Sequence, residues 1–365
     1  MLKLFEVSGF KNFKDKISLN FADVRDYKFN NKCILNNMIG KSIIYGKNSA
    51  GKSNFGLAMF DIVAHLSSKH VTPNLYDYYL NASSDKDFAE FHYIFQFDDD
   101  IIDYLYRKND KQNLIYEKLI LNDILLYEYD YKHSVGYTEG IKKMAPTLNW
   151  AFQDSQCILK YMVNNTVLSE LHPLRKMIRF VDRMLWFRSL DENRYIGLST
   201  KSDDYFDFIM EDGVLEEFQA FLHKAGIKED VTLISDADSN KRLYFKTEKP
   251  LPFFKVASNG TKALYTFFYW YKIGKDVSLM FIDEFDAFYH FELSETIVEM
   301  LENMIDTQVI LTSHNTNLLT NRIMRPDCYF ILTDGKLTSL TNATSRELRE
   351  GHNLEKLYMS GEFNG

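Results

Sequence analysis

The residues "GKNSAGKS" at positions 46 to 53 constrain the fold more than any other stretch of the chain. They follow the apolar run "SIIY" and precede "NFGLAMFDIVAHL", in which apolar residues recur at helical spacing. A strand, a glycine-rich turn and a helix in this order direct several backbone N–H groups to one point, where they can bind a phosphate. We therefore expect an α/β fold with its site at the carboxyl ends of parallel strands.

This loop matches the pattern G-x-x-x-x-G-K-[ST]. In that pattern the lysine reaches the β and γ oxygens of a nucleotide and the hydroxyl group coordinates Mg²⁺. The sequence therefore predicts ATP and Mg²⁺ as the cofactors, with Ser53 as a metal ligand. The predicted nucleotide-binding residues are Gly46, Lys47, Asn48, Ser49, Ala50, Gly51, Lys52, Ser53 and Asn54.

Two later apolar runs end in residues that suit the same chemistry. "LMFIDE" ends in Asp283, which can hold a hydrated Mg²⁺, and Glu284, which can polarise the attacking water. "QVILTSH" ends in His314, whose imidazole can contact a terminal phosphate. Taken singly, each run also fits a strand that leaves the core at a polar residue. With the phosphate loop in the same chain, we expect Asp283 to be a metal ligand and Glu284 and His314 to be catalytic.

The stretch "ASNGTKAL" lies shortly before these acids at a probable helix start. Free backbone amides and the helix dipole make such a position an anion site. An ordinary serine N-cap followed by a glycine turn would explain the same residues. The residues concerned are Ser258, Asn259, Gly260 and Thr261.

These stretches together give a specific resemblance. The chain resembles ABC-class ATPases of the AAA15, AbiLi or RloA-like group, which are relatives of the heads of OLD, RecF and SMC proteins, over nearly its whole length. The stretches that carry the resemblance are "GFKNF", "GKNSAGKS", "RLYFK", "SNGTKAL", "FIDEFDAFYH", "LTSHNTNLL" and the closing "LREGHNLEKLYMSGEFNG".

The resemblance implies roles for further residues. The 258–261 stretch would be a signature that binds the nucleotide of the opposite subunit, and Asp286 would be the D-loop aspartate at the dimer interface. Residue 257 and Asn259 depart from the usual "ESSGT" or "LSSG" signature. His290 would follow the D-loop, although a packing role explains it equally well. Gln96 is a candidate for the Q-loop and for a metal ligand because of its distance beyond Lys52, although its place within a predicted strand favours a structural role.

The predicted architecture is an ABC-type P-loop NTPase head of the α/β class. It has a mixed or parallel central sheet, an antiparallel β subdomain built from the aromatic-rich runs between 88 and 130, and a helical insertion. The expected division is an N-terminal ATPase lobe at 1–130, the helical insertion at 131–232, a C-terminal lobe at 233–345 and a tail at 346–365.

Composition narrows the functional classes. The net charge of -8 argues against a broad nucleic-acid surface, and the dispersed cysteines predict neither a disulfide framework nor a zinc site. No leader or membrane helix is apparent, so we expect a cytoplasmic protein. The resemblance implies a slow ATPase that forms an ATP-dependent homodimer or higher oligomer. It would act as a switch in bacterial phage defence and control a separate effector, a nuclease or toxin.

Two alternatives stay open at this stage. A RecF- or SMC-like head would clamp DNA in repair, and the basic stretch "HPLRKMIRF" could form part of such a surface, although basic helix faces are usually just solvated. A nucleotide-binding subunit of a membrane transporter fits less well, because a long meander and a helical segment separate the loop from the signature.

Overall fold

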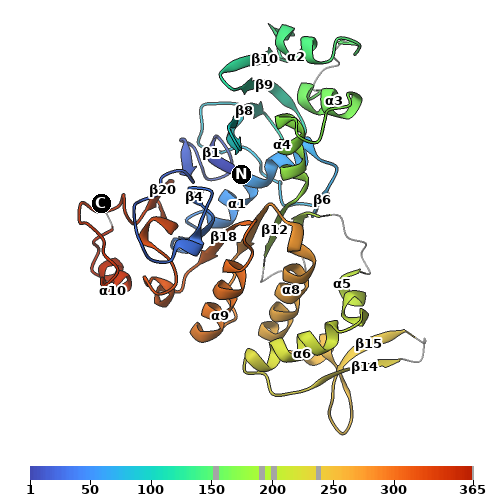
Figure 1. Cartoon of the computed structure of the whole chain (residues 1–365), viewed down its shortest axis with the longest axis vertical. Helices are drawn as coiled ribbons and strands as arrows, with labels where there is room; N and C mark the ends of the chain where they lie inside the picture. The colour runs from blue at the N-terminus through green and yellow to red at the C-terminus, as the bar shows by residue number, and fades with distance from the viewer. Residues whose placement is uncertain (151–155, 189–193, 199–203, 236–239, 364–365) are drawn as a thin grey trace.

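The computed structural model describes residues 1–150, 156–188, 194–198, 204–235 and 240–363 (Figure 1). Its largest sheet has the strand order β20-β19-β5-β18-β17-β12-β13-β6. Neighbours from β19 to β12 run parallel, whereas β20, β13 and β6 are antiparallel to theirs. The sheet is therefore mixed with a parallel centre, as predicted. Its strands are β5 (Lys41–Tyr45), β6 (His70–Val71), β12 (Met184–Arg188), β13 (Tyr195–Gly197), β17 (Leu279–Asp283), β18 (Gln308–Ser313), β19 (Tyr329–Thr333) and β20 (Lys336–Ser339).

The central strands of this sheet are buried along their whole length. Every residue of β5, β17 and β18 is buried. Parallel strands that are covered on both faces read as continuous apolar runs, which is why "SIIY", "LMFI" and "QVIL" could be recognised in the sequence. The polar residues that follow each run therefore leave the sheet at one common edge.

A second, antiparallel sheet has the order β11-β10-β9-β8-β7-β1-β2. In β7 alternate residues are buried, so one face of this sheet packs inward. The predicted meander between 88 and 130 is confirmed. The strands are β1 (Leu2–Ser8), β2 (Ile17–Asn20), β7 (Ala89–Phe97), β8 (Asp100–Lys108), β9 (Leu114–Leu121), β10 (Ile124–Asp130) and β11 (Val135–Tyr137).

Helix α1 (Lys52–Leu66) lies between the two sheets. The Tyr93 hydroxyl of β7 donates a hydrogen bond to the carbonyl of Ala58 at 3.1 Å. From the other sheet, the ring of Phe281 on β17 meets Phe60 with centroids 6.4 Å apart. A helix in contact with both sheets must be apolar on most sides, and residues 55–63 of α1 are all buried. The phosphate loop is thus attached to the most enclosed helix of the fold.

The stretch 131–232 differs from the helical module that its periodicity predicts. Helices form as expected at several places, but α4 ends at Asp182 and residues Met184–Arg188 continue as strand β12 beside β17. The reason is that "MLWF" is a short, fully apolar run, and such a run fits a buried strand as well as a helix. The division of the chain at 131 and 232 stays a prediction. The helices are α2 (Glu139–Met144), α3 (Ile158–Asn165), α4 (Pro173–Asp182), α5 (Asp204–Asp207) and α6 (Val214–Lys224).

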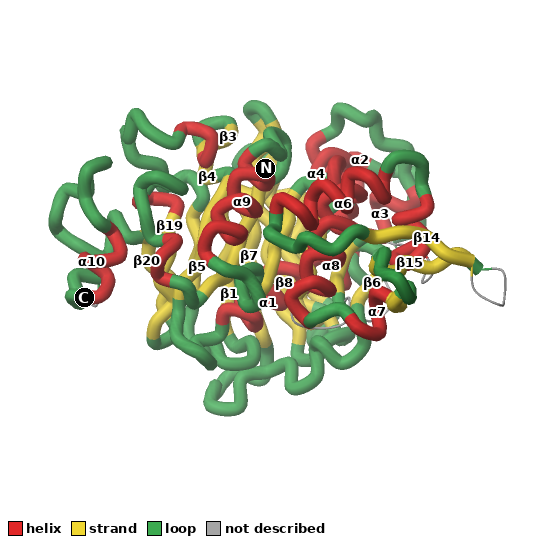
Figure 2. Tube along the Cα trace, turned by 90° about the horizontal axis from the view of Figure 1, so that it is seen from below, coloured by secondary structure: helices red, strands yellow, loops and turns green. Residues whose placement is uncertain are grey.

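The remaining helices belong to the C-terminal half. Helices α8 and α9 lie side by side, as Figure 2 shows, and Trp270 of α8 stacks on Phe187 of β12 with centroids 5.9 Å apart. None of the helices within the described ranges has both the length and the apolar composition to cross a membrane. These helices are α7 (Phe253–Val256), α8 (Asn259–Ile273), α9 (Phe291–Glu302) and α10 (Leu354–Met359).

Short elements complete the described chain. A three-stranded sheet, β14-β15-β16, projects beyond α6 (Figure 1), and β3 pairs with β4. The strands of the three-stranded sheet are β14 (Val231–Ser235), β15 (Lys241–Phe245) and β16 (Leu251–Pro252). The two-stranded sheet consists of β3 (Ile34–Leu35) and β4 (Met38–Ile39). The 3-10 turns are η1 (Asn31–Cys33), η2 (Phe208–Met210), η3 (Gly274–Asp276), η4 (Thr316–Leu318) and η5 (Pro326–Cys328).

The closing segment of the chain packs on the residues that follow β18. The side-chain amide of Asn321 donates to the carbonyls of Arg349, Glu350 and His352 at 3.0 to 3.1 Å. The Thr316 hydroxyl donates to Glu355 of α10 at 3.2 Å. The tail thus supports the loop that carries His314.

Candidate functional site

The loop between β5 and α1 needs its two glycines for different reasons. A Cβ on Gly46 would come within 2.8 Å of the Leu332 carbonyl oxygen, so this glycine lets the loop pass close to β19. Gly51 has φ 106°, a left-handed conformation, and a Cβ there would lie 2.2 Å from the side-chain amide of Asn12. Ser49 is also left-handed, with φ 65°. Left-handed residues placed between right-handed ones turn successive backbone N–H groups toward the inside of the loop.

Asn12 lies directly against this loop. Its side-chain amide donates to the Ala50 carbonyl at 3.3 Å, and its carbonyl oxygen accepts from Asn54 at 2.8 Å. The turn "KNF" near the N-terminus thus braces the loop.

Lys52 folds back onto its own loop. Its ammonium donates to the Gly46 carbonyl at 2.7 Å and lies 3.0 and 3.3 Å from the two ring nitrogens of His314. Burial lowers the pKa of Lys52, whereas Asp283 and two neighbouring acids oppose that shift. Burial and the Lys52 charge both lower the pKa of His314. A neutral imidazole can therefore accept a hydrogen bond from the ammonium here.

Asp283 ends β17 with a fully buried carboxylate. The Thr312 hydroxyl on β18 donates to its Oδ1 at 2.8 Å and accepts from the Glu284 N–H at 2.7 Å, so one side chain positions both acids. The other oxygen, Oδ2, accepts no hydrogen bond from the described residues. Burial raises the pKa of Asp283, and the hydroxyls of Ser53 and Thr312 together with Arg188 oppose the rise. Glu284 has φ 51°, a left-handed turn that takes the chain out of the strand.

The oxygen of Asp283 that accepts no hydrogen bond from the described residues is the observation that tests a metal site. A buried carboxylate oxygen without a donor is costly, and a cation with oxygen ligands removes that cost. The Ser53 hydroxyl lies close enough to the Asp283 carboxylate to lower its pKa, and a hydroxyl oxygen is the hard ligand chemistry that Mg²⁺ prefers. Ser53 and Asp283 therefore fit a hydrated Mg²⁺ ion.

Arg188 is the residue of this site that sequence analysis missed. It ends β12, where it is paired in register with Asp283 on β17. Its Nη2 and Nε atoms lie 2.8 and 3.2 Å from Glu284 Oε2, and its Nε lies 3.6 Å from Asp283 Oδ2. The sequence signal for Arg188 is a basic residue directly after the apolar run "MLWF". Because the sequence predicts a helical insertion there, the run is not recognised as a strand that ends at the site.

Gln96 does not reach this site, and its prediction as a metal ligand is wrong. It lies near the end of β7, where its backbone exchanges hydrogen bonds with Met1. Asn12, which touches the phosphate loop, follows the opposite end of β1. The six residue steps of β1 separate the two ends by about 20 Å. The side chain of Gln96 donates to the Asp98 carbonyl at 3.3 Å instead.

Asp286 lies just beyond the two acids, with its side chain turned inward. The Ser313 hydroxyl of β18 donates to its Oδ2 at 2.6 Å, and burial raises its pKa. His290 is exposed and precedes α9, where its carbonyl oxygen accepts from Ser294. The structure thus brings Asp286 to the same strand end as His314, whereas His290 takes part in the start of a helix.

The 258–261 turn forms the start of α8. Ser258 is its N-cap: the Oγ atom accepts the Thr261 N–H at 3.1 Å and contacts the Thr261 hydroxyl at 2.9 Å. Ser258 and Asn259 are exposed. A Cβ on Gly260 would lie 3.3 Å from the Phe288 carbonyl oxygen. No hydrogen bond or ion pair between described residues joins this turn to residues 46–53 of the same chain.

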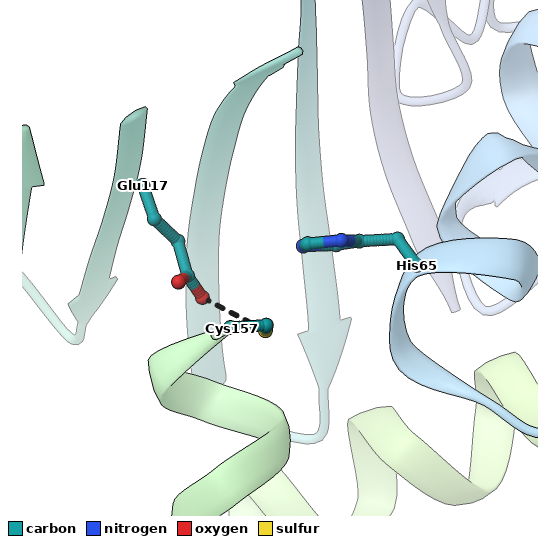
Figure 3. A group of neighbouring side chains, drawn as sticks. All are labelled: His65, Glu117 and Cys157. Carbon is teal, nitrogen blue, oxygen red and sulfur yellow. Dashed lines mark hydrogen bonds between the residues drawn. The ribbon is translucent and has the colours of Figure 1, made fainter. Parts of the chain in front are cut away.

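A second polar cluster is buried beside the C-terminal end of α1 (Figure 3). His65, Glu117 and Cys157 come from α1, β9 and the start of α3, and their ligand-type atoms lie within 4.8 Å of one another. The Tyr104 hydroxyl lies between them, 2.8 Å from His65 Nε2 and 2.9 Å from Glu117 Oε1.

Glu117 already has a full set of donors. It accepts from the hydroxyls of Tyr104, Tyr127 and Tyr131, from the Cys157 thiol and from the N–H groups of Ile158 and Leu159. With its lone pairs occupied, this carboxylate connects the meander to α3 and has no capacity left for a metal ion.

Comparison with known proteins gives one family and a set of solved structures. A family model described as "AAA domain, putative AbiEii toxin, Type IV TA system" matches residues 41–320. No curated protein matches the sequence. Among solved structures, the Smc head bound to the C-winged helix domain of ScpA is similar, with a TM-score of 0.47 and 15% identity over 93% of this chain and 97% of that one.

Two further solved structures are similar to the chain. The SMC head domain from Thermotoga maritima has a TM-score of 0.43 and 13% identity, covering 93% of this chain and 98% of that one. The Smc head with an extended coiled coil bound to the C-terminal domain of ScpA, derived from Pyrococcus furiosus, has a TM-score of 0.45 and 13% identity, covering 94% and 97%.

Proposed function

Because the chain belongs to the AAA domain family of the AbiEii type, we propose that it binds and hydrolyses ATP with Mg²⁺. The observation that supports this most is the meeting of Lys52, Asp283 and His314 at the carboxyl edge of three adjacent parallel strands. A phosphate loop, a buried carboxylate with one oxygen that accepts no hydrogen bond from the described residues, and a histidine at one edge match the needs of phosphoryl transfer.

In the proposed reaction Lys52 leaves Gly46 and His314 and donates to the β and γ oxygens of ATP. Ser53 and Asp283 would hold Mg²⁺, which would supply charge neutralisation at the phosphates. Glu284 accepts a proton from the attacking water, whose oxygen forms the new bond to the γ-phosphorus as the bond to ADP breaks. His314 donates to the γ-phosphate.

We further propose that a second copy completes the site. The start of α8 is exposed and is not joined to its own loop, and its first N–H groups can bind an anion. If it faces the nucleotide of the other copy, ATP holds two chains together and hydrolysis releases them. Slow turnover suits such a switch.

The variant Glu284→Gln tests this proposal. It keeps the shape of the side chain but cannot accept a proton, so ATP turnover should fall at least about a hundredfold. Mg-ATP should then convert the protein to a stable dimer, measured by light scattering after size-exclusion chromatography. Lys52→Ala, which loses the phosphate contact, should stay monomeric under the same conditions. A Glu284→Gln variant that remains monomeric at saturating Mg-ATP contradicts the clamp.

The cellular role that we propose is a nucleotide-gated switch in bacterial phage defence, which controls a separate nuclease or toxin. The family description, which names a toxin of a type IV toxin–antitoxin system, supports a role in such a pair. The test is purification of the tagged chain from its native host before and after infection. An effector should copurify before infection and be lost afterwards. Absence of a partner in both samples contradicts this role.

The DNA-clamping alternative loses its main support on α4. Lys176 pairs with Asp98 at 2.6 Å, and Arg175 and Arg179 both lie within 4 Å of Glu170. These three cations are therefore partly neutralised by acids of the same chain. Salt-dependent DNA binding that requires ATP would restore the alternative.

A further inference from the structure

We propose that Arg188 is an internal counter-ion of the metal site. It holds Glu284 and Asp283 while no divalent cation is bound, and it releases them when the cation arrives. This inference rests on the proposed function, because it assigns a role to Arg188 toward the ion that Ser53 and Asp283 would hold. It adds to that function a reason why the site stays inactive without metal.

The position of Arg188 is set by strand pairing. Parallel pairing of β12 with β17 places Arg188 beside Asp283, and the guanidinium then reaches Glu284 in the following turn. Two of its nitrogens contact the same oxygen, Glu284 Oε2, at 2.8 and 3.2 Å. The side chain of Arg188 is 30% exposed, so it has a solvated path by which to leave.

Charge explains why a cation is needed here. Asp283 is fully buried and adjoins the carboxylate of Glu284, whose side chain is 19% exposed, and two neighbouring carboxylates repel each other. Among the residues that the structure describes, Arg188 alone makes an ion pair with either acid. Its 3.6 Å approach to Asp283 Oδ2 directs it at the oxygen that lacks a hydrogen-bond donor.

A divalent ion and the guanidinium compete for this oxygen. An Mg²⁺ ion bound at Asp283 Oδ2 would place two positive groups within a few ångströms of each other, so one must move. The ion carries the larger charge and arrives with ATP, so Arg188 leaves. Release of Arg188 also frees Glu284, which cannot act as a base while a guanidinium occupies its oxygen. Water activation is thereby tied to metal binding.

The experiment measures Mn²⁺ affinity at saturating non-hydrolysable ATP analogue, by electron paramagnetic resonance of free Mn²⁺. Arg188→Met removes the competing charge and should lower the midpoint, the Mn²⁺ concentration at half-saturation, by about tenfold. The reason is that the ion no longer has to displace the ion pair of Arg188 with the two acids. Arg188→Lys keeps a charge but loses the forked contact, so it should lower the midpoint by about threefold. Arg183→Met is the matched control: Arg183 pairs with the exposed Asp276 at 3.1 Å, and its loss should leave the midpoint unchanged.

The outcomes separate this inference from the proposed function. If the wild-type protein binds no analogue with Mn²⁺, the proposed function fails. If it binds and both Arg188 variants have an unchanged or higher midpoint, only the counter-ion role is overturned. Circular dichroism checks that each variant is folded. If Arg188→Met does not fold, the Arg188→Lys midpoint decides.

Discussion

At the scale of single residues, the Thr312 hydroxyl positions both acids of the site. It donates to Asp283 and accepts from the Glu284 N–H. Because Thr312 is fully buried, solvent water cannot take over these two hydrogen bonds. Residues adjacent to the two acids in the sequence could not do this, because the Thr312 hydroxyl reaches both acids from the neighbouring strand β18. The geometry of the acids therefore depends on a residue that belongs to a different strand.

Thr312→Val should expose this dependence. Valine has the same shape but leaves a buried acceptor and a buried donor unpaired, so the free energy of unfolding should fall by about 1 to 3 kcal/mol. Thr312→Ser keeps the hydroxyl and serves as the control. Urea unfolding followed by tryptophan fluorescence measures both. Equal stability of the valine and serine variants would mean that the bridge contributes nothing.

At the scale of elements, α1 connects the phosphate loop to the antiparallel sheet through buried polar contacts. Asp61 accepts from Lys108 at 2.7 Å and from Tyr79 at 2.8 Å, and His65, one turn later, contacts Tyr104. These contacts fix the register of α1 against the meander and the loop that carries Tyr79. A shift of the loop helix would break several of them together, so we infer that α1 and the meander move as one body.

The burial of His65 should make the stability of the fold depend on pH. Burial holds its pKa well below its usual range, and the charges of Lys108 and Lys160 act in the same direction. Below about pH 6.5 the unfolded chain binds a proton at His65 that the folded chain does not. The contribution of His65 to the free energy of unfolding should therefore fall as the pH decreases, with a slope that approaches about 1.4 kcal/mol per pH unit well below pH 6.5.

The measurement is the free energy of unfolding in urea between pH 7.5 and 5.5. His65→Phe removes the titrating group and keeps an aromatic ring, so over this range its pH slope should be shallower than that of the wild type by about half a proton on average. His133→Phe is a control, because His133 is exposed. Identical slopes in the wild type and the His65 variant would show that His65 is protonated in the folded state.

At the scale of the whole molecule, the proposed site needs two chains. An equal mixture of Lys52→Ala and Ser258→Asp, each inactive alone, should regain ATP turnover, up to about half of the wild-type value, since each mixed dimer has one intact site of two. Aspartate remains a good N-cap, so α8 stays folded while its charge repels phosphate. The neutral cap Ser258→Asn is the control and should stay active. A mixture as inactive as its components would place the turn outside the site.

The sequence by itself determined the phosphate loop, the three apolar strands that end in polar residues, and the antiparallel meander. Each of these is local: a loop with two special glycines, continuous apolar runs in a covered parallel sheet and alternating aromatic runs all leave a periodic signal in neighbouring residues. The α/β fold class, the mixed sheet and the residues Lys52, Asp283 and His314 could therefore be named in advance and were found at one edge.

Tertiary structure alone decided which residue lies beside Asp283. Gln96 was predicted from its distance along the chain, yet strand pairing carries it to the far end of β1, while the pairing of β12 with β17 brings in Arg188. The same holds for Glu117 and His65, which meet from separate elements. Pairing between strands remote in sequence follows from burial of whole faces, and no short stretch of residues encodes it.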